Sequence, residues 1–210
     1  MSAIIQQTVF TIGHSNMESS KFVALLGEHG IEAVADVRSS PYSQYNPQFN
    51  REPLELELRK HGLAYVFLGA ELGARRSEAG CYVNRRVDYS LIALTPAFKR
   101  GLERIIQGAD KRRIAVMCAE KDPVDCHRGI LIAPQLQARG MPVVHILIDG
   151  SLEPHAHTER RLLQLFNLPE RELFRSADEI LAGAYKAQEE RIAYQDDALV
   201  LREHPPRYGN

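Results

Sequence analysis

The stretch Ile114-Ala-Val-Met-Cys-Ala-Glu-Lys-Asp-Pro-Val-Asp-Cys-His-Arg-Gly129 carries the most information about this chain. It begins with an apolar run typical of a buried strand and continues through a polar loop into a predicted helix. The strand ends at Cys118, and the helix opens beside Cys126, His127 and Arg128. Two thiols, an imidazole, a guanidinium and a carboxylate in one strand-to-helix turn indicate a functional site rather than a simple connection.

The same alternation of strand and helix patterns continues on both sides of this stretch. Apolar or β-branched runs predict strands at residues 8–12, 31–37, 63–68, 113–117 and 142–148. Amphipathic patterns predict helices from Ser15 or Asn16 to Gly30, from Pro53 to His61, across 88–106 with a break near Thr95, and from Val124 to Arg139. Buried-type strands alternating with helices indicate an α/β fold, a Rossmann-like parallel sheet of about five strands with helices on both faces.

The domain organisation follows from this pattern. Residues 1–150 are expected to form the α/β domain, and residues 151–210 a helical C-terminal extension packed on the same domain. No repeat, low-complexity run or clear linker divides the chain. Pro134 lies inside the predicted 124–139 helix and is expected to kink it, because proline removes a backbone hydrogen bond.

Composition narrows the class of protein. The formal net charge of -1 excludes a polycation, so any nucleic-acid contact would need a local basic patch. Three cysteines are too few for a disulfide scaffold and indicate reduced thiols, as found in the cytoplasm. The N-terminus lacks a signal-peptide pattern, and no apolar run reaches the ~20 residues of a membrane span. We therefore expect a cytoplasmic protein with no membrane partner.

Polar residues follow four of the predicted strands. In a parallel sheet with right-handed crossovers, the carboxyl ends of the strands meet at one edge, where α/β proteins bind ligands. The sequence therefore predicts one cleft, lined by His14, Ser15, Asp36, Arg38, Cys118, Glu120, Cys126, His127 and Arg128.

Several segments of the chain carry a resemblance to a known family. They occur in the expected order, and they are Thr11–Ser15, Asp36–Pro41, Gly62–Tyr65, Thr95–Phe98 and Met117–Arg128. Together they resemble the domain of unknown function (DUF) 488 family over residues 8 to 150 or so. The resemblance implies the α/β fold and implies no particular reaction.

The first functional hypothesis is an enzyme acting on a phosphorylated or nucleotide-like substrate. Cys126 lies beside a histidine and an arginine, which lower a thiol pKa, so it would serve as nucleophile or ligand. The other catalytic candidates are the proton carriers Glu120, His127 and His14. The residues expected to bind the small anionic substrate are Arg38, Arg128, Asp36 and Ser15.

Structural alternatives exist for several of these residues. Cys118 can be a small core residue, since free cysteine is often buried. Asp36 and Arg38 can form an ion pair that only stabilises the strand end. Glu120 can bond the amides of its own loop. The sequence leaves both interpretations open at each position.

Three other functions compete with the enzyme hypothesis. A transition metal ion would be bound by Cys118 and Cys126, together with His127, Glu120 or His14. A redox sensor would use the same cysteines through occasional oxidation. A nucleic-acid-associated factor would use arginines and tyrosines of the segment that follows the third strand, namely Arg75, Arg76, Arg85, Arg86, Tyr82 and Tyr89.

Overall fold

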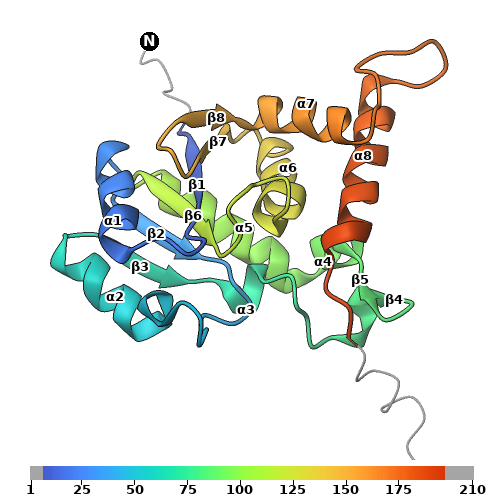
Figure 1. Cartoon of the computed structure of the whole chain (residues 1–210). Helices are drawn as coiled ribbons and strands as arrows, with labels where there is room; N and C mark the ends of the chain where they lie inside the picture. Colours follow the sequence, from blue (N-terminus) through green and yellow to red (C-terminus); the bar gives the residue numbers. More distant parts are fainter. Residues whose placement is uncertain (1–6, 197–210) are drawn as a thin grey trace, which may run out of the picture.

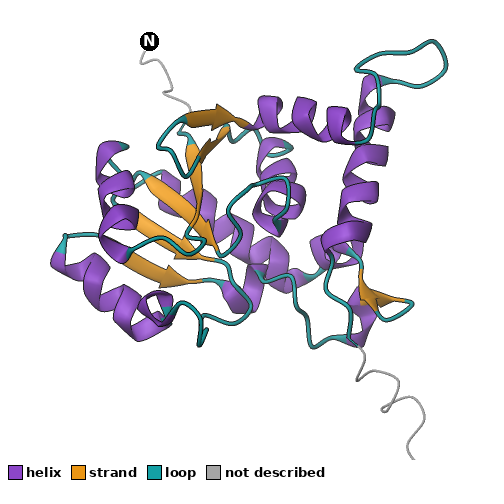
Figure 2. Cartoon of the chain, in the orientation of Figure 1, coloured by secondary structure: helices purple, strands orange, loops and turns teal. Residues whose placement is uncertain are grey.

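The computed structural model describes residues 7–196, which form a six-stranded sheet flanked by helices (Figures 1 and 2). The strand order across the sheet is β3-β2-β6-β1-β7-β8. The strands are β1 (Val9–Gly13), β2 (Ala33–Asp36), β3 (Ala64–Phe67), β6 (Ile114–Cys118), β7 (Val143–Ile146) and β8 (Leu152–Pro154). The strands from β3 to β7 are parallel, which confirms the predicted sheet, whereas β8 pairs antiparallel with β7 and was not predicted.

Helices cover both faces of the sheet, as the buried character of the strands predicts (Figure 1). On one face, α1 (Ser19–Glu28) and α2 (Arg51–Lys60) bury apolar side chains such as Phe22 and Leu54 against the strands. On the other, α5 (Pro96–Ala109) and α6 (Ala133–Gln137) bury Leu102 and Leu136. The α/β class and the helical C-terminal region are therefore confirmed.

The C-terminal helices belong to the same core. They are α7 (His155–Leu165) and α8 (Ala177–Ile192), and their Leu162, Ile180 and Ala184 join the apolar cluster of the α5 face. A capping box of Ser176 and Glu179 starts α8. The extension predicted at 151–210 thus begins with a strand of the sheet, and its residues 197–210 lie outside the described part of the chain.

A buried chain of hydrogen bonds also fastens these helices to the sheet. Thr11 Oγ1 lies 2.6 Å from His145 Nδ1, and His145 Nε2 lies 2.8 Å from His155 Nδ1. His155 Nε2 lies 2.9 Å from the Tyr185 hydroxyl, which donates to Glu159 at 3.0 Å. The chain therefore connects the middle of the sheet with α7 and α8 through groups that all have polar partners.

The predicted helix at 124–139 has a different form. Residues Arg128–Ile132 form a π-helix, and α6 follows with Pro134 in its first turn. Ala133 N–H donates to the carbonyl of Arg128, five residues earlier. Because Pro134 has no N–H, the widened turn accommodates a position where an ordinary helical bond cannot form. Where the sequence predicts a kink, the chain forms this π-helical turn.

Two other predictions about local structure need correction. The first helix begins at Ser19, and its N-cap is Glu18 rather than Ser15 or Asn16; Ser15 has a positive φ of 49°, unlike the extended backbone that an N-cap adopts. Residues 69–87, where the sequence predicts no helix or strand, contain α3 (Gly69–Leu72) and a small hairpin of β4 (Tyr82–Val83) and β5 (Arg86–Val87). Short elements of this kind leave no periodic signal in a sequence.

The remaining elements are the 3₁₀ turns Pro47–Phe49 and Ala79–Cys81 and the helix α4 (Tyr89–Leu94). The predicted break near Thr95 is confirmed, since Thr95 caps α5 by accepting from Phe98 N–H. Among the helices of residues 7–196, none combines the length and the apolar character that crossing a membrane requires.

The register of the strands decides where the polar residues meet. Gly13 of β1 lies opposite Cys118 of β6, and Asp36 of β2 lies opposite Met117. The carboxyl ends of β1, β2, β3 and β6 therefore lie along one edge of the sheet, as predicted. The segments that follow these strands face the same space.

Candidate functional site

A cleft of ≈ 410 Å³ lies at the carboxyl edge of the sheet. We call the part lined by the loop after β6 its floor, and its walls come from the segment after β2 and from α4 and the end of α8. The lining residues are His14, Arg38, Ser39, Ser40, Tyr42, Ser43, Asn46, Ala74, Arg75, Tyr89, Cys118, Ala119, Glu120, Asp125, His127, Ile192 and Tyr194.

The loop after β6 is held against the end of β1. His14 N–H donates to the carbonyl of Cys118 at 3.0 Å, and Ser15 N–H donates to that of Ala119 at 2.8 Å. The Arg128 guanidinium, which is fully buried, donates to the carbonyls of Glu120 at 2.7 Å and Lys121 at 3.0 Å. Arg128 therefore anchors the loop from within and does not line the cleft, in contrast to the substrate-binding position predicted for it.

The loop brings four reactive side chains into one cluster, formed by Cys118, Glu120, Cys126 and His127. Glu120 Oε2 lies 2.9 Å from Cys118 Sγ and 3.0 Å from Cys126 Sγ. His127 Nδ1 lies 3.5 Å from Cys118 Sγ and 3.9 Å from Cys126 Sγ. One atom from each of the four lies within 4.8 Å of the others.

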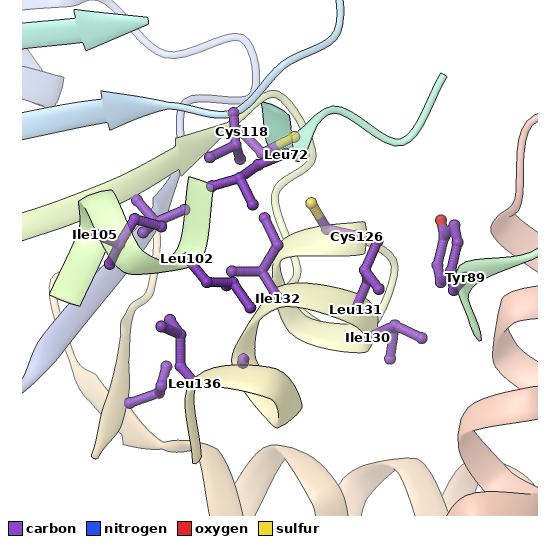
Figure 3. Packing of buried hydrophobic residues seen from close by; sticks show 14 of the residues in the cluster. Leu72, Tyr89, Leu102, Ile105, Cys118, Cys126, Ile130, Leu131, Ile132 and Leu136 are labelled. Atoms are coloured by element: carbon purple, nitrogen blue, oxygen red, sulfur yellow. The ribbon is translucent and has the colours of Figure 1, made fainter. Parts of the chain in front are cut away.

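The two cysteines reach this cluster from different elements. Figure 3 shows Cys118 at the end of β6 and Cys126 at the turn before the π-helix, at the margin of the apolar cluster that contains Leu72 and Ile132. Both cysteines are buried. Their sulfur atoms therefore combine apolar surroundings with a polar neighbour, Glu120.

A backbone carbonyl orients the imidazole of His127. The His127 Nε2 atom lies 3.2 Å from the carbonyl oxygen of Val37. A carbonyl only accepts hydrogen bonds, so Nε2 carries the proton and Nδ1 of the neutral ring presents its lone pair to the cysteines. The ring is buried and held in this orientation from β2.

The surroundings separate the pKa values of the two thiols. Burial and the neighbouring Cys126 raise the pKa of Cys118 well above its usual value. Burial opposes ionisation of Cys126 too, but the hydrogen bond from Cys118, the charge of Arg128 and the contact with His127 lower its pKa well below the usual value. The pair thus favours one thiolate, on Cys126, beside one protonated thiol.

The negative charge of Cys126 also raises the pKa values of Glu120 and His127. Burial of the carboxylate and the negative charge of Cys126 raise the pKa of Glu120. Burial lowers the pKa of His127, but its hydrogen bond with Cys126 and that negative charge outweigh burial and raise it. Both groups can therefore hold or release a proton next to the thiols.

A second group of polar residues forms the wall beside the cluster. Arg38 forms a buried bidentate ion pair with Asp36, with Nη2–Oδ2 2.6 Å and Nε–Oδ1 2.9 Å. Tyr65 donates to the same carboxylate at 2.8 Å. Asp36 and Arg38 therefore form the ion pair that the sequence offered as a structural alternative. Arg38 lines the cleft, whereas Asp36 does not.

His14 lies between the wall and the cluster. Its Nδ1 lies 2.7 Å from the carbonyl of Ser15, and its Nε2 lies 3.2 Å from Arg38 Nη1. Burial and the charge of Arg38 lower the pKa of His14 to about 4. His14 is therefore neutral near pH 7, with its free lone pair directed at Arg38. Ser15 is half-buried and does not line the cleft.

Sequence reasoning did not assign several cleft residues to the site. The Arg75 guanidinium lies over the ring of Tyr194, 5.0 Å from its centroid, and the backbone N–H of Arg75 donates to Ser39 Oγ at 2.8 Å. Tyr42 lies on the wall formed after β2. The Ser39-Ser40 pair at the end of a predicted strand was a usable signal, whereas Tyr194 gave none because it arrives from the end of α8.

The arginine pairs proposed for nucleic acid do not act as one surface. Arg76 is buried and donates to the carbonyls of Ala70 and Glu71, both at 3.1 Å. Arg86 donates to the carbonyl of Glu190 at 2.8 Å. Arg75 and Tyr89 line the cleft instead. Arg75 and Tyr89 thus belong to the cleft and do not form an extended basic surface with Arg76 and Arg86.

Comparisons with known proteins place the chain in a family and name no activity. The family described as "Domain of unknown function DUF488" matches residues 18–133, more than half of the chain, which confirms the resemblance seen in the sequence. No curated protein and no solved structure matches the chain. The matched region contains the four residues of the cluster together with Asp36 and Arg38.

Proposed function

This chain belongs to the DUF488 family, and we propose that it is an enzyme acting on a small phosphorylated or nucleotide-like substrate. The observation that carries the proposal is the position of the Cys118, Glu120, Cys126 and His127 cluster. Three of its members line the floor of a cleft whose walls carry Arg38 and Arg75. Reactive groups beside cationic groups in a concave site are typical of enzymes that bind anions.

The two arginines supply the binding part of the proposal. Arg38 is fixed by Asp36 and keeps its Nη1 edge toward His14 and the cleft. Arg75 is exposed, so its guanidinium can meet an incoming phosphate without first losing a buried partner. The tyrosines of the cleft offer ring faces for a planar group, and they are Tyr42, Tyr89 and Tyr194.

The cluster supplies the reactive part. Cys118 is the thiol that lines the cleft, and Cys126 lies behind it. Glu120 and His127 are within reach of both sulfurs and can exchange protons with a bound substrate. The three cysteines are free thiols, which supports a reducing compartment such as the cytoplasm.

Ligand-dependent thermal stability tests the proposal. We expect a nucleoside monophosphate to stabilise the protein more than the matching nucleoside, because the arginines recognise the phosphate. Arg75→Gln should weaken this binding by about tenfold or more, since a charge-assisted contact is lost. Arg139→Gln is the matched control, because Arg139 is an exposed arginine in the turn after α6 that bonds Gln135 and does not line the cleft. Equal stabilisation by nucleoside and nucleotide would contradict the proposal.

A further inference from the structure

We infer that Cys118, Glu120, Cys126 and His127 form the binding site for one divalent transition-metal ion of the zinc type, an inference that rests on the proposed function for its role in the cleft. Sequence alone suggested the cysteines as ligands and left the histidine and carboxylate ligands open. The structure brings His127 and Glu120 to the sulfurs, whereas the Nε2 of His14 is directed at Arg38.

The spacing of the donor atoms fits one tetrahedral ion. With zinc bonds of about 2.3 Å to sulfur and about 2.1 Å to nitrogen or oxygen, donor atoms lie roughly 3.3–3.8 Å apart. The four distances between the sulfurs and their Glu120 and His127 partners are 2.9, 3.0, 3.5 and 3.9 Å. The other two pairs of donor atoms lie within 4.8 Å, so shifts of up to about 1 Å would place an ion at the centre, and flexible side chains allow such shifts.

Hydrogen bonds and strand pairing around the cluster hold the ligands in ligating orientations. The carbonyl of Val37 accepts a hydrogen bond from the Nε2–H group of His127, so Nδ1 is left to coordinate. The backbone N–H of Arg128 points at Cys126 Sγ, 3.4 Å away. Cys118 is fixed by the pairing of β6 with β1. The site therefore needs little reorganisation when a metal binds.

The local charges also suit a cation bound by thiolates. Two thiolates, one carboxylate and a neutral imidazole carry three negative charges, and a divalent ion neutralises two of them. The buried guanidinium of Arg128 acts electrostatically on Cys126, and Arg38 acts on Cys118. One negative charge then remains, and the charge of Arg128 offsets it, because Arg38 is already paired with Asp36. Without a metal, both buried sulfur atoms lie against the same carboxylate oxygen, Glu120 Oε2, at 2.9 and 3.0 Å.

The chemistry of the donors selects the class of ion. Thiolate and imidazole ligands favour zinc, iron(II) or cobalt(II) over magnesium and calcium, which prefer oxygen. Cys118, Glu120 and His127 line the cleft, so the ion would lie at its floor. The carboxylate of Glu120 lies against the sulfurs, but of the four residues Glu120 alone has substantial surface open to solvent, which makes it the ligand that a substrate or water molecule can displace.

Metal analysis and cobalt spectroscopy test the inference. The full chain, stripped with a chelator and reloaded with zinc(II) or cobalt(II) under reducing conditions, is expected to bind about one ion per chain. The cobalt form should show thiolate-to-metal charge-transfer absorption. Cys118→Ser and Cys126→Ser should each abolish stoichiometric binding. Cys81→Ser is the matched control, because Cys81 is a buried free thiol in the apolar core outside the cluster.

Three results would overturn the metal site. They are substoichiometric metal after reloading, a cobalt spectrum without a thiolate band, and equal metal loss in Cys81→Ser. If the cysteine variants fail to fold, the wild-type cobalt spectrum still decides, because it reports sulfur ligation directly. Stoichiometric metal with no phosphate-dependent stabilisation would leave the site intact and refute the proposed substrate class, so the two failures are distinguishable.

Discussion

A Cβ atom on Gly13 would lie 1.9 Å from the carbonyl oxygen of Glu120. The loop that carries the cluster therefore crosses directly over the end of β1, at a distance that only glycine permits. The same Cβ would lie 2.9 Å from the Arg128 guanidinium that anchors this loop. The end of the first strand and the floor of the cleft are thus one packed unit.

Replacing Gly13 with alanine should displace the loop. We expect Gly13→Ala to lower the free energy of unfolding by about 1–3 kcal/mol, the usual cost of overpacking, and to reduce cobalt binding. Gly27→Ala is the control, because a Cβ on Gly27 of α1 meets nothing within 4 Å. That control should be neutral or stabilising by about 0.5–1 kcal/mol. Matching denaturation midpoints for the two variants would show that the loop tolerates the shift.

Arg128 should affect stability before it affects ligand binding. Lysine keeps the charge but cannot donate to the carbonyls of both Glu120 and Lys121 in the same geometry. We expect Arg128→Lys to lower the free energy of unfolding by about 1–3 kcal/mol, because a buried acceptor loses its partner. Arg139→Lys, on an exposed bond to Gln135, should change it little. Urea denaturation compares the two, and an unchanged midpoint for Arg128→Lys would refute the anchoring role.

The buried histidine chain should make stability depend on pH. Burial lowers the pKa of His155 to about 4 and that of His145 well below its usual value. Between pH 6.5 and 4 the unfolded chain therefore binds more protons than the folded one, so stability falls as the pH falls. His155 alone contributes at most on the order of 3 kcal/mol to this loss, at about 1.4 kcal/mol per pKa unit.

A pH series of urea denaturation measures this dependence. His155→Gln should reduce the loss of stability between pH 6.5 and 4, although the variant is less stable at neutral pH. His157→Gln on the same helix is the control, because His157 is exposed and outside the chain of hydrogen bonds. If the free energy of unfolding falls with pH as steeply in His155→Gln as in the wild type, groups other than His155 dominate acid unfolding.

The contact between α8 and the site loop should matter for the cleft. Gln188 is fully buried, and its Nε2 donates to the carbonyl of Val124 and to Asp125 Oδ1, both at 3.0 Å. Gln188→Leu keeps the volume but leaves that carbonyl without its donor, so we expect a loss of about 1–3 kcal/mol in unfolding free energy. Glu190→Gln, exposed on the same helix, is the control. Faster hydrogen exchange at residues 122–126 in Gln188→Leu alone would locate the effect.

The fold could be predicted from the sequence because continuous apolar runs mark its strands, and segments with a helical spacing of apolar residues separate them. Ile114–Cys118 and its partner strands are buried on both faces, which requires a continuous apolar pattern that can be recognised locally. β8 and the β4–β5 hairpin were not predicted, because strands of three and two residues are too short to show an alternation of apolar and polar side chains. For the π-helix, the sequence offered only Pro134. Its missing N–H predicts an interruption of the helical hydrogen bonds but does not distinguish a kink from a π-helical turn.

The candidates for the cluster could be predicted, but its exact members and the roles of its neighbours could not. By itself the sequence placed Cys118, Glu120, Cys126 and His127 in one strand-to-helix turn, since they are close along the chain, and it left open which of Glu120, His127 and His14 lie at the thiols. Only the tertiary structure decided that Arg128 turns inward to the loop carbonyls, and that Tyr194 arrives from α8 to line the cleft. Those outcomes depend on packing between segments far apart in sequence, where the direction of a side chain is set by its surroundings rather than by its neighbours in the chain.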